Sequence, residues 1–139
     1  MVDVLDARLL SLPRVSDPRG NLTFVESDRQ IPFQLRRVFY LYDVPSGESR
    51  AGHAHRRLQE VIIAASGSFD VILDDARTKR TVTLRRSDQG LYVPGMLWRT
   101  LTGFSSGSVC LVLCSEFYDP GDYYRDLDEY ATAVAAARC

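Results

Sequence analysis

Cysteine and histidine are both scarce in this chain of 139 residues. The three cysteines, Cys110, Cys114 and Cys139, are odd in number and lack the regular spacing of a disulfide framework. This pattern predicts reduced thiols in the cytoplasm and argues against a disulfide-stapled scaffold. Cys110 and Cys114 lie in SVCLVLCSE, which has the composition of a buried strand. A structural role in the core is therefore favoured for both over a metal or redox role.

Long runs of one residue class are missing too. The formal net charge is −1 and no long run of one sign occurs, so nothing favours nucleic acid or an anionic membrane as a partner. No stretch approaches the roughly 20 apolar residues of a membrane helix. The first residues, MVDVLDARLL, include early acidic side chains and no long apolar run, so we expect no secretory signal there. The composition is still compatible with an anionic small molecule as a ligand, because binding of such a ligand depends on where arginines lie and less on the total charge.

The sequence is instead rich in short segments with strand composition, separated by turn residues at regular spacing. The expected strands cover residues 4–12, 21–26, 35–44, 60–65, 68–75, 80–86, 91–104 and 109–115. Only the stretch from about residue 122 to 138 has helical composition. About nine or ten short strands with little helix predict an antiparallel sandwich or barrel. We therefore expect a single all-β domain over residues 1–139 with a short C-terminal helical tail.

The stretch 47–67, GESRAGHAHRRLQEVIIAASG, holds both histidines of the chain. His53 and His55 are separated by one residue, so on a strand both imidazoles point to the same face. Such a pair can be a metal site, an acid/base device or an accident of packing. The spacing resembles the first motif of cupins at every fixed position, from Gly47 through the two histidines and Glu60 to Gly67. This resemblance implies a cupin-type small β-barrel or jelly roll, and it says less about chemistry because that scaffold hosts many activities.

A metal site is one possibility that the motif raises. His53, His55 and Glu60 are of the types that form a two-histidine, one-carboxylate face for iron(II) or manganese. Cupin metal sites usually add a histidine from a second motif, but the corresponding GLYVPGMLWRT has none. Arg99 lies near that position, and a guanidinium has a fixed positive charge and no lone pair to donate. We therefore expect no metal and no other cofactor, with a metal-dependent cupin such as a dioxygenase kept as an alternative.

A longer resemblance covers nearly the whole chain. It is carried by DPRGNLTFVE (17–26), RRVFYLYDVP (36–45), RAGHAHR (50–56), GSFDVILDD (67–75), GLYVPGMLWR (90–99) and SEFYDPGDYYRDLDEY (115–130). These blocks resemble the cupin-fold dTDP-4-keto-6-deoxyglucose 3,4-ketoisomerase family. The related dTDP-sugar 3,5-epimerases share the DxRG segment, but they typically have one histidine, in a block like RGLHYQ. His55 stands where that glutamine would be, so the isomerase is favoured and the epimerase is the nearest competitor. Glu60 departs from the glutamine that is frequent in the family.

The resemblance implies a reaction that needs a base and an acid. A 3,4-ketoisomerase moves a proton between C3 and C4 through an enediol, and histidine, with a pKa of about 6.5, suits both tasks. The family pattern implies His55 as the base and His53 as its partner in proton transfer to oxygen. Tyr40 is a further candidate proton donor, although core packing explains it equally well.

The same resemblance implies a dTDP-linked 4-keto-6-deoxy sugar as the substrate. The expected substrate-binding residues are Arg19, Glu26, Arg37, Tyr42, Arg50, Trp98 and Arg99. Arginine suits a diphosphate because its contacts are charge-assisted and often bidentate. The aromatic run at 117–130 is expected to be a packed lid or tail. We also expect a homodimer, compatible with exchange of the strand at 4–12. A non-catalytic module that binds nucleotide sugars is the remaining alternative.

Overall fold

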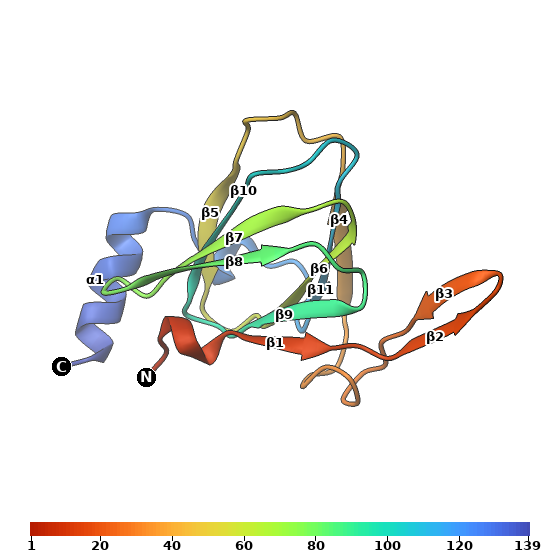
Figure 1. The fold of residues 1–139 in the computed structure, drawn as a ribbon. Helices are drawn as coiled ribbons and strands as arrows, with labels where there is room; N and C mark the ends of the chain where they lie inside the picture. The colour runs from red at the N-terminus through yellow and green to blue at the C-terminus, as the bar shows by residue number, and fades with distance from the viewer.

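Two antiparallel five-stranded sheets face each other in the computed structural model, which describes residues 1–139 except for the side chain of Ala51 (Figure 1). The first sheet has the order β1 (Arg8–Ser11), β9 (Gln89–Val93), β6 (Glu60–Ser66), β11 (Val109–Cys114) and β4 (Arg37–Leu41). The second has the order β12 (Tyr123–Tyr124), β5 (Arg50–His55), β10 (Trp98–Thr102), β7 (Phe69–Asp74) and β8 (Lys79–Leu84). The all-β, cupin-like jelly roll expected from the sequence is confirmed.

The core lies between the two sheets. Buried and half-buried residues alternate along β7, as expected for a strand with one face toward the interior. The central strands β6 and β11 are buried on both faces because Ile31 and Phe33, from the segment before β4, cover their outer side. Cys110 and Cys114 are free thiols and fully buried, so their predicted place in the core is confirmed.

The N-terminal segment differs from its prediction. Residues 4–6 form the short 3₁₀ helix η1 (Val4–Asp6), because the Asp3 carboxylate accepts the Leu5 N–H at 2.7 Å and begins a turn. The strand therefore starts only at Arg8. A hairpin of β2 (Arg14–Asp17) and β3 (Gly20–Thr23) follows, and it projects away from the barrel (Figure 1). The expected strand at 21–26 thus ends at Thr23, and it pairs with a neighbour that the sequence did not indicate.

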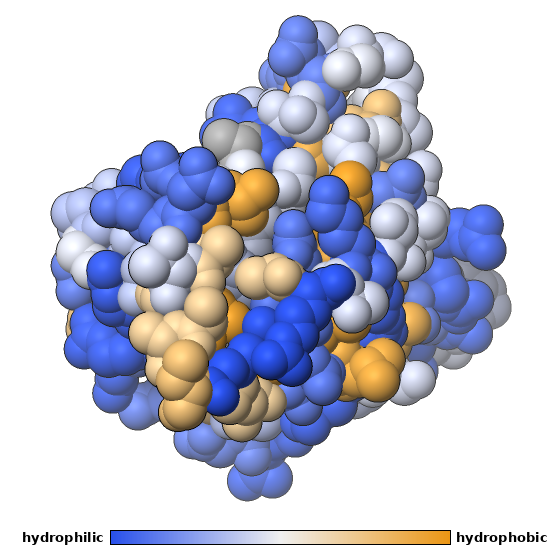
Figure 2. Space-filling model, turned by 90° about the vertical axis from the view of Figure 1, so that its left-hand side faces the viewer, coloured by the Kyte–Doolittle hydropathy of each residue, from blue (hydrophilic) through white to orange (hydrophobic). Residues whose placement is uncertain are grey.

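The C-terminal segment also starts its helix later than predicted. Residues 120–122 form η2 (Pro120–Asp122), β12 follows at once, and α1 spans Leu127–Ala137 with Asp126 as its N-cap. Tyr130 and Val134 of α1 pack on Ala54 and Trp98, on the outer side of the second sheet. Figure 2 shows that the face bearing α1 is mainly hydrophilic, with one stripe of weakly hydrophobic residues and a few more hydrophobic groups beside it. Within the described part of the chain, no helix has the length and apolar character of a membrane span.

Candidate active site

Both histidines project from β5 into the space between the sheets. Their ring centroids are 4.7 Å apart with an interplanar angle of 79°. His55 is buried and His53 is half-buried. Gly52 and Ala54 face the other way, where a Cβ at Gly52 would collide with the Trp98 indole. The predicted placement of His53 and His55 on one face of the strand is therefore confirmed.

A buried ion pair lies beside the histidines. Arg99 of β10 is the cross-strand partner of His53, so the two side chains share one face of the sheet. Its Nε donates to Glu60 Oε1 at 2.7 Å and its Nη2 to Oε2 at 3.2 Å. Burial disfavours the ionised carboxylate, but the Arg99 guanidinium outweighs this and lowers the pKa of Glu60 to about 2. The pair therefore stays charged at neutral pH.

The geometry does not fit the two-histidine, one-carboxylate metal face. Arg99 occupies both oxygens of Glu60, and its fixed charge faces the same space as the imidazoles. Among the residues whose side chains are described, no three His, Cys, Asp or Glu side chains are grouped so that they could hold a metal ion. That the protein works without a metal stays a prediction.

Both imidazoles are neutral at pH 7. Burial, aided by the Arg99 charge, lowers the pKa of His53 to about 3. Burial also lowers the pKa of His55, and the Glu60 carboxylate only partly opposes this. The Nε2 atom of His53 is buried and has no hydrogen-bond partner among the described residues. A neutral imidazole has one N–H and one lone pair, so it can both donate a proton to a substrate oxygen and accept one from it.

Tyr123 completes the histidine cluster, and the sequence analysis did not identify it. It pairs with His55 across the β12–β5 ladder, and its ring centroid lies 4.4 Å from that of His55 and 5.0 Å from that of His53. The Arg125 guanidinium lies over the same ring at 4.2 Å. The run at 117–130 was expected to be a packed lid or tail. The structure shows that one of its tyrosines contacts both histidines.

Arg37 is the predicted substrate-binding arginine with the clearest place in this site. It projects inward from β4, with its guanidinium carbon 4.8 Å from the Phe39 ring and 5.1 Å from the Tyr118 ring. Its charge contributes to lowering the pKa of His55, after burial and Arg99. Its Nη1 is buried without a hydrogen-bond partner among the described residues. Such a donor is suited to an anionic ligand.

Trp98 and the two tyrosines of the β4 region lie elsewhere. Trp98 and Arg99 are consecutive in a strand, so only one of them can face the histidines, and Trp98 packs on Tyr130 instead, at 5.6 Å between ring centroids. Tyr40 and Tyr42 do share a face, but it is the outer face of the sheet, where they are 59% and 61% exposed. Within one chain, none of these three side chains reaches the histidines.

The remaining candidates are at the surface. Arg19 lies at the tip of the β2–β3 hairpin, where its Nη2 donates to the Asp17 carboxylate at 2.8 Å. Arg50 is exposed at the start of β5. Glu26 is exposed as well, and its backbone N–H donates to the Gln30 side chain. Their roles in binding stay predictions.

Comparisons with known proteins agree with this architecture. The family model described as "FdtA: WxcM-like, C-terminal" matches residues 5–135. The TDP-4-oxo-6-deoxy-alpha-D-glucose-3,4-oxoisomerase of Aneurinibacillus thermoaerophilus is 36% identical over 131 residues, which cover 94% of this chain and 94% of that protein.

Solved structures extend the similarity to three dimensions. WlaRB, a TDP-quinovose 3,4-ketoisomerase from Campylobacter jejuni, is 38% identical with a TM-score of 0.88, covering 93% of this chain and 99% of that chain. QdtA, a sugar 3,4-ketoisomerase from Thermoanaerobacterium thermosaccharolyticum in complex with TDP, is 31% identical with a TM-score of 0.95, covering 99% and 100%. A histidine-to-asparagine variant of QdtA has been solved with TDP-4-keto-6-deoxyglucose. The chain therefore belongs to the FdtA, WxcM-like family, which includes TDP-sugar 3,4-ketoisomerases.

Proposed function

We propose that this protein is a sugar-nucleotide 3,4-ketoisomerase that converts dTDP-4-keto-6-deoxy-D-glucose to the 3-keto-6-deoxyhexose. The observation that carries the proposal is the pair of neutral, adjacent imidazoles facing the barrel interior beside a fixed guanidinium. The relatives that act on such sugars cover nearly the whole chain. The two histidines, Arg99 and Tyr123 all belong to one and the same chain.

The chemistry needs a proton to leave C3 and a proton to arrive at C4. In the proposed mechanism, His55 removes the C3 proton while His53 supplies a proton to the C4 oxygen, which gives an enediol. The imidazolium of His55 exchanges its proton with solvent and then delivers a proton to C4, and His53 takes the proton from the C3 oxygen, which becomes the carbonyl. The positive charge of Arg99 favours negative charge that develops on the sugar oxygens. Arg37 is the candidate residue for binding the diphosphate of the substrate.

The test follows deuterium from solvent. Chelator-treated protein is incubated with dTDP-4-keto-6-deoxyglucose in D₂O, and the product is followed by NMR. Deuterium at C4 of a 3-keto sugar is expected. Exchange at C5 would identify a 3,5-epimerase, and activity lost to the chelator together with one iron or manganese per chain would identify a metal-dependent cupin. Binding of dTDP without turnover would leave only a nucleotide-sugar binding module.

A homodimer is part of the proposal. The exposed side chains of Val38, Tyr40 and Tyr42 form an apolar strip on the outer face of β4 and the residues after it. A hollow of about 660 Å³ lies nearby, between the β2–β3 hairpin and the outer face of the first sheet. Apolar side chains line much of it, namely Leu12, Val25, Leu35, Ile63, Leu111 and Leu113. A second copy of the chain that covers the outer face of the first sheet would bury both the apolar strip and the hollow. It would also bring the hairpin that carries Arg19 near the partner subunit. The free cysteines fit a cytoplasmic location.

A further inference from the structure

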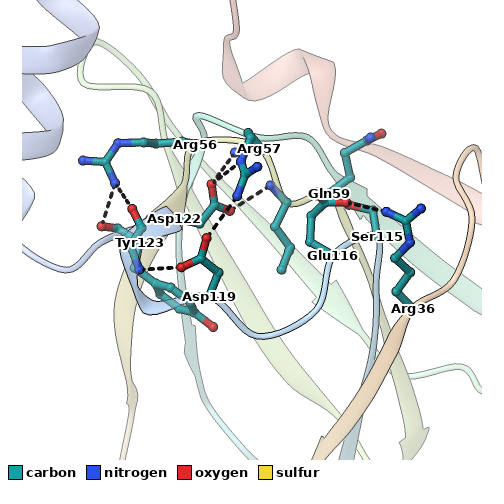
Figure 3. Close-up of polar contacts among 11 residues, drawn as sticks. Arg36, Arg56, Arg57, Gln59, Ser115, Glu116, Asp119, Asp122 and Tyr123 are labelled. Atoms are coloured by element: carbon teal, nitrogen blue, oxygen red, sulfur yellow. Dashed lines mark hydrogen bonds and ion pairs between the residues drawn. The ribbon is translucent and has the colours of Figure 1, made fainter.

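The turn that follows the histidine strand is bound by a single buried carboxylate, that of Asp122. Its Oδ1 accepts the backbone N–H of Arg57 at 2.9 Å, and its Oδ2 accepts that of Leu58 at 3.0 Å (Figure 3). Asp122 is only 4% exposed. In return, the Arg56 N–H donates to the Asp122 carbonyl at 2.8 Å, and the Arg56 side chain donates to the Gly121 carbonyl at 2.7 Å. These bonds join the segment before α1 firmly to the residues just after His55.

This attachment fixes the position of Tyr123. Tyr123 follows Asp122 directly, and Arg57 and Leu58, whose N–H groups the Asp122 carboxylate accepts, lie two and three residues after His55. These two bonds, called the clamp below, therefore act close in sequence to both members of the contact. Charge-assisted hydrogen bonds that backbone N–H groups donate to a buried carboxylate are among the stronger hydrogen bonds in proteins. The β12 strand that carries Tyr123 has only two residues, and so few ladder bonds cannot hold it alone.

The histidine rings need such a support. A catalytic imidazole is commonly oriented by a hydrogen bond from its second ring nitrogen. Among the described residues, neither His53 nor His55 makes a side-chain hydrogen bond, and the Nε2 of His53 is buried without a partner. Each ring instead lies against Tyr123, in edge or tilted contacts. Packing against Tyr123, together with the contact between the two rings themselves, is therefore what limits rotation of the rings.

We propose that Asp122 is a positioning residue that sets the orientation of His53 and His55 by holding Tyr123 against both rings. This role rests on the proposed isomerase function, because ring orientation decides which sugar atoms the imidazoles reach. Asp122 itself faces the backbone of the turn and not the substrate space.

Asp119 offers a matched control within the same cluster. It also pairs with Arg57, Oδ2 to Nη2 at 3.1 Å, but it is half-exposed and binds no backbone N–H of the turn (Figure 3). Asp119→Asn therefore removes an exposed ion pair of little energetic weight. Asp122→Asn instead presents an amide NH₂ to one of two backbone donors, so only one of the two bonds survives.

The experiment compares these two variants by NMR of the imidazole nitrogens and by steady-state kinetics. The chain has only two histidines, so the spectrum is simple to assign. Asp122→Asn is expected to shift both imidazole signals and to lower kcat by about 100-fold with little change in KM, as for a misplacement of about 1 Å. Asp119→Asn leaves signals and kcat near those of the wild type. Equal effects of the two variants would overturn the proposal.

A double-variant cycle tests whether Asp122 acts through Tyr123. Tyr123→Leu should reproduce the Asp122→Asn spectrum and kinetics, whereas Tyr123→Phe, which keeps the ring, should retain most activity. Adding Asp122→Asn to Tyr123→Leu should cause no further loss of kcat, and additive losses would refute the mechanism. If Asp122→Asn fails to fold, the two Tyr123 variants, which keep the clamp, test the contact through which Asp122 is proposed to act. Imidazole signals and kcat in Tyr123→Leu that match the wild type would overturn the proposal. The NMR signals are read without substrate, so failure of the isomerase assay does not obscure them.

Discussion

Arg99 lies directly across the antiparallel ladder from His53, and Glu60 holds its guanidinium through two hydrogen bonds. The three side chains are an imidazole, the cation across the ladder from it, and the carboxylate that balances that cation. Arg99 makes it harder for His53 to accept a proton, and Glu60 partly offsets that effect. The reactivity of the imidazole therefore depends on a pair of charges that are both shielded from water.

Replacing Glu60 with glutamine should destabilise the fold. The variant Glu60→Gln leaves the buried Arg99 charge without compensation, and breaking one partner of a buried pair costs about 3 kcal/mol or more. The free energy of unfolding, measured with urea, should fall accordingly. The exposed pair Arg19–Asp17 supplies the control, because Asp17→Asn should change stability by less than about 0.5 kcal/mol. Similar losses in both variants would show that Glu60 does not balance Arg99.

Removing both charges together is the companion test. Glu60→Leu combined with Arg99→Met replaces the pair with apolar side chains of similar volume, which is often neutral or stabilising. The double variant should therefore be more stable than Glu60→Gln while being inactive. A double variant that is less stable than the single one would mean that the pair serves packing more than charge balance.

Stability should fall as the pH is lowered through the range of free histidine. Burial depresses the folded-state pKa of His53 to about 3, whereas the unfolded chain has an ordinary value near 6.5. Below that value the unfolded state binds more protons than the folded state, so the free energy of unfolding decreases as the pH falls from about 7.5 to 5. Urea unfolding across this window measures the slope.

The variant His53→Gln isolates the contribution of His53, because it removes one of the two titrating imidazoles and should make the slope shallower. A smaller slope of the same sign should remain, since burial also lowers the pKa of His55. Glu60 does not interfere, since its lowered folded pKa contributes stability that is lost only as the pH falls through about 4.5 toward 2. An unchanged slope in His53→Gln would mean that His53 is not held neutral by its surroundings.

Alternation of side chains along single strands predicted the arrangement of the two histidines. It did not predict contacts between segments that are distant in the sequence. Alternation along a strand is a property of the chain itself, so it placed both imidazoles on one face. It also grouped Tyr40 with Tyr42 but gave no indication of which face of the strand is inside. The same alternation excludes a shared role for Trp98 and Arg99, a consequence that the sequence analysis did not draw.

The other features that the sequence did not predict depend on contacts between distant segments or on segments without a pattern. Tyr123 reaches the histidines through a two-residue strand, which is too short to show any periodicity. The β2–β3 hairpin has almost fully exposed strands, so it has no apolar face by which a sequence pattern could reveal it.

Substitution of either histidine should stop proton transfer and spare binding. His53→Asn and His55→Asn each remove an imidazole while keeping a polar side chain, and loss of general acid–base catalysis costs about 100- to 10,000-fold. Deuterium incorporation at C4 should fall by that amount, while calorimetry should still detect dTDP. Because His55 is the assigned base, His55→Asn should lose exchange of the C3 hydrogen with solvent entirely, whereas His53→Asn should retain a trace of it. The reverse order would exchange the two roles.

The outer face of β4 should control association. Tyr40→Arg places a charge in the exposed apolar strip of Val38, Tyr40 and Tyr42, and it should convert a dimer into single chains, as measured by light scattering. Thr132→Arg, on the exposed side of α1, adds the same charge on the opposite face and should leave the dimer intact. Dissociation by both variants, or by neither, would remove β4 from the interface.

A mixing experiment then tests whether the hairpin serves the partner subunit. Arg19→Ala and His53→Asn should each lower activity as homodimers. If Arg19 binds the substrate in the partner's site, a mixed dimer has one site with both an intact His53 and an intact Arg19 from the other chain. Refolding equal amounts of the two variants should therefore restore about a quarter of the wild-type activity, because about half the dimers are mixed and each has one complete site. If each Arg19 serves its own chain, no mixed site is complete and activity does not return.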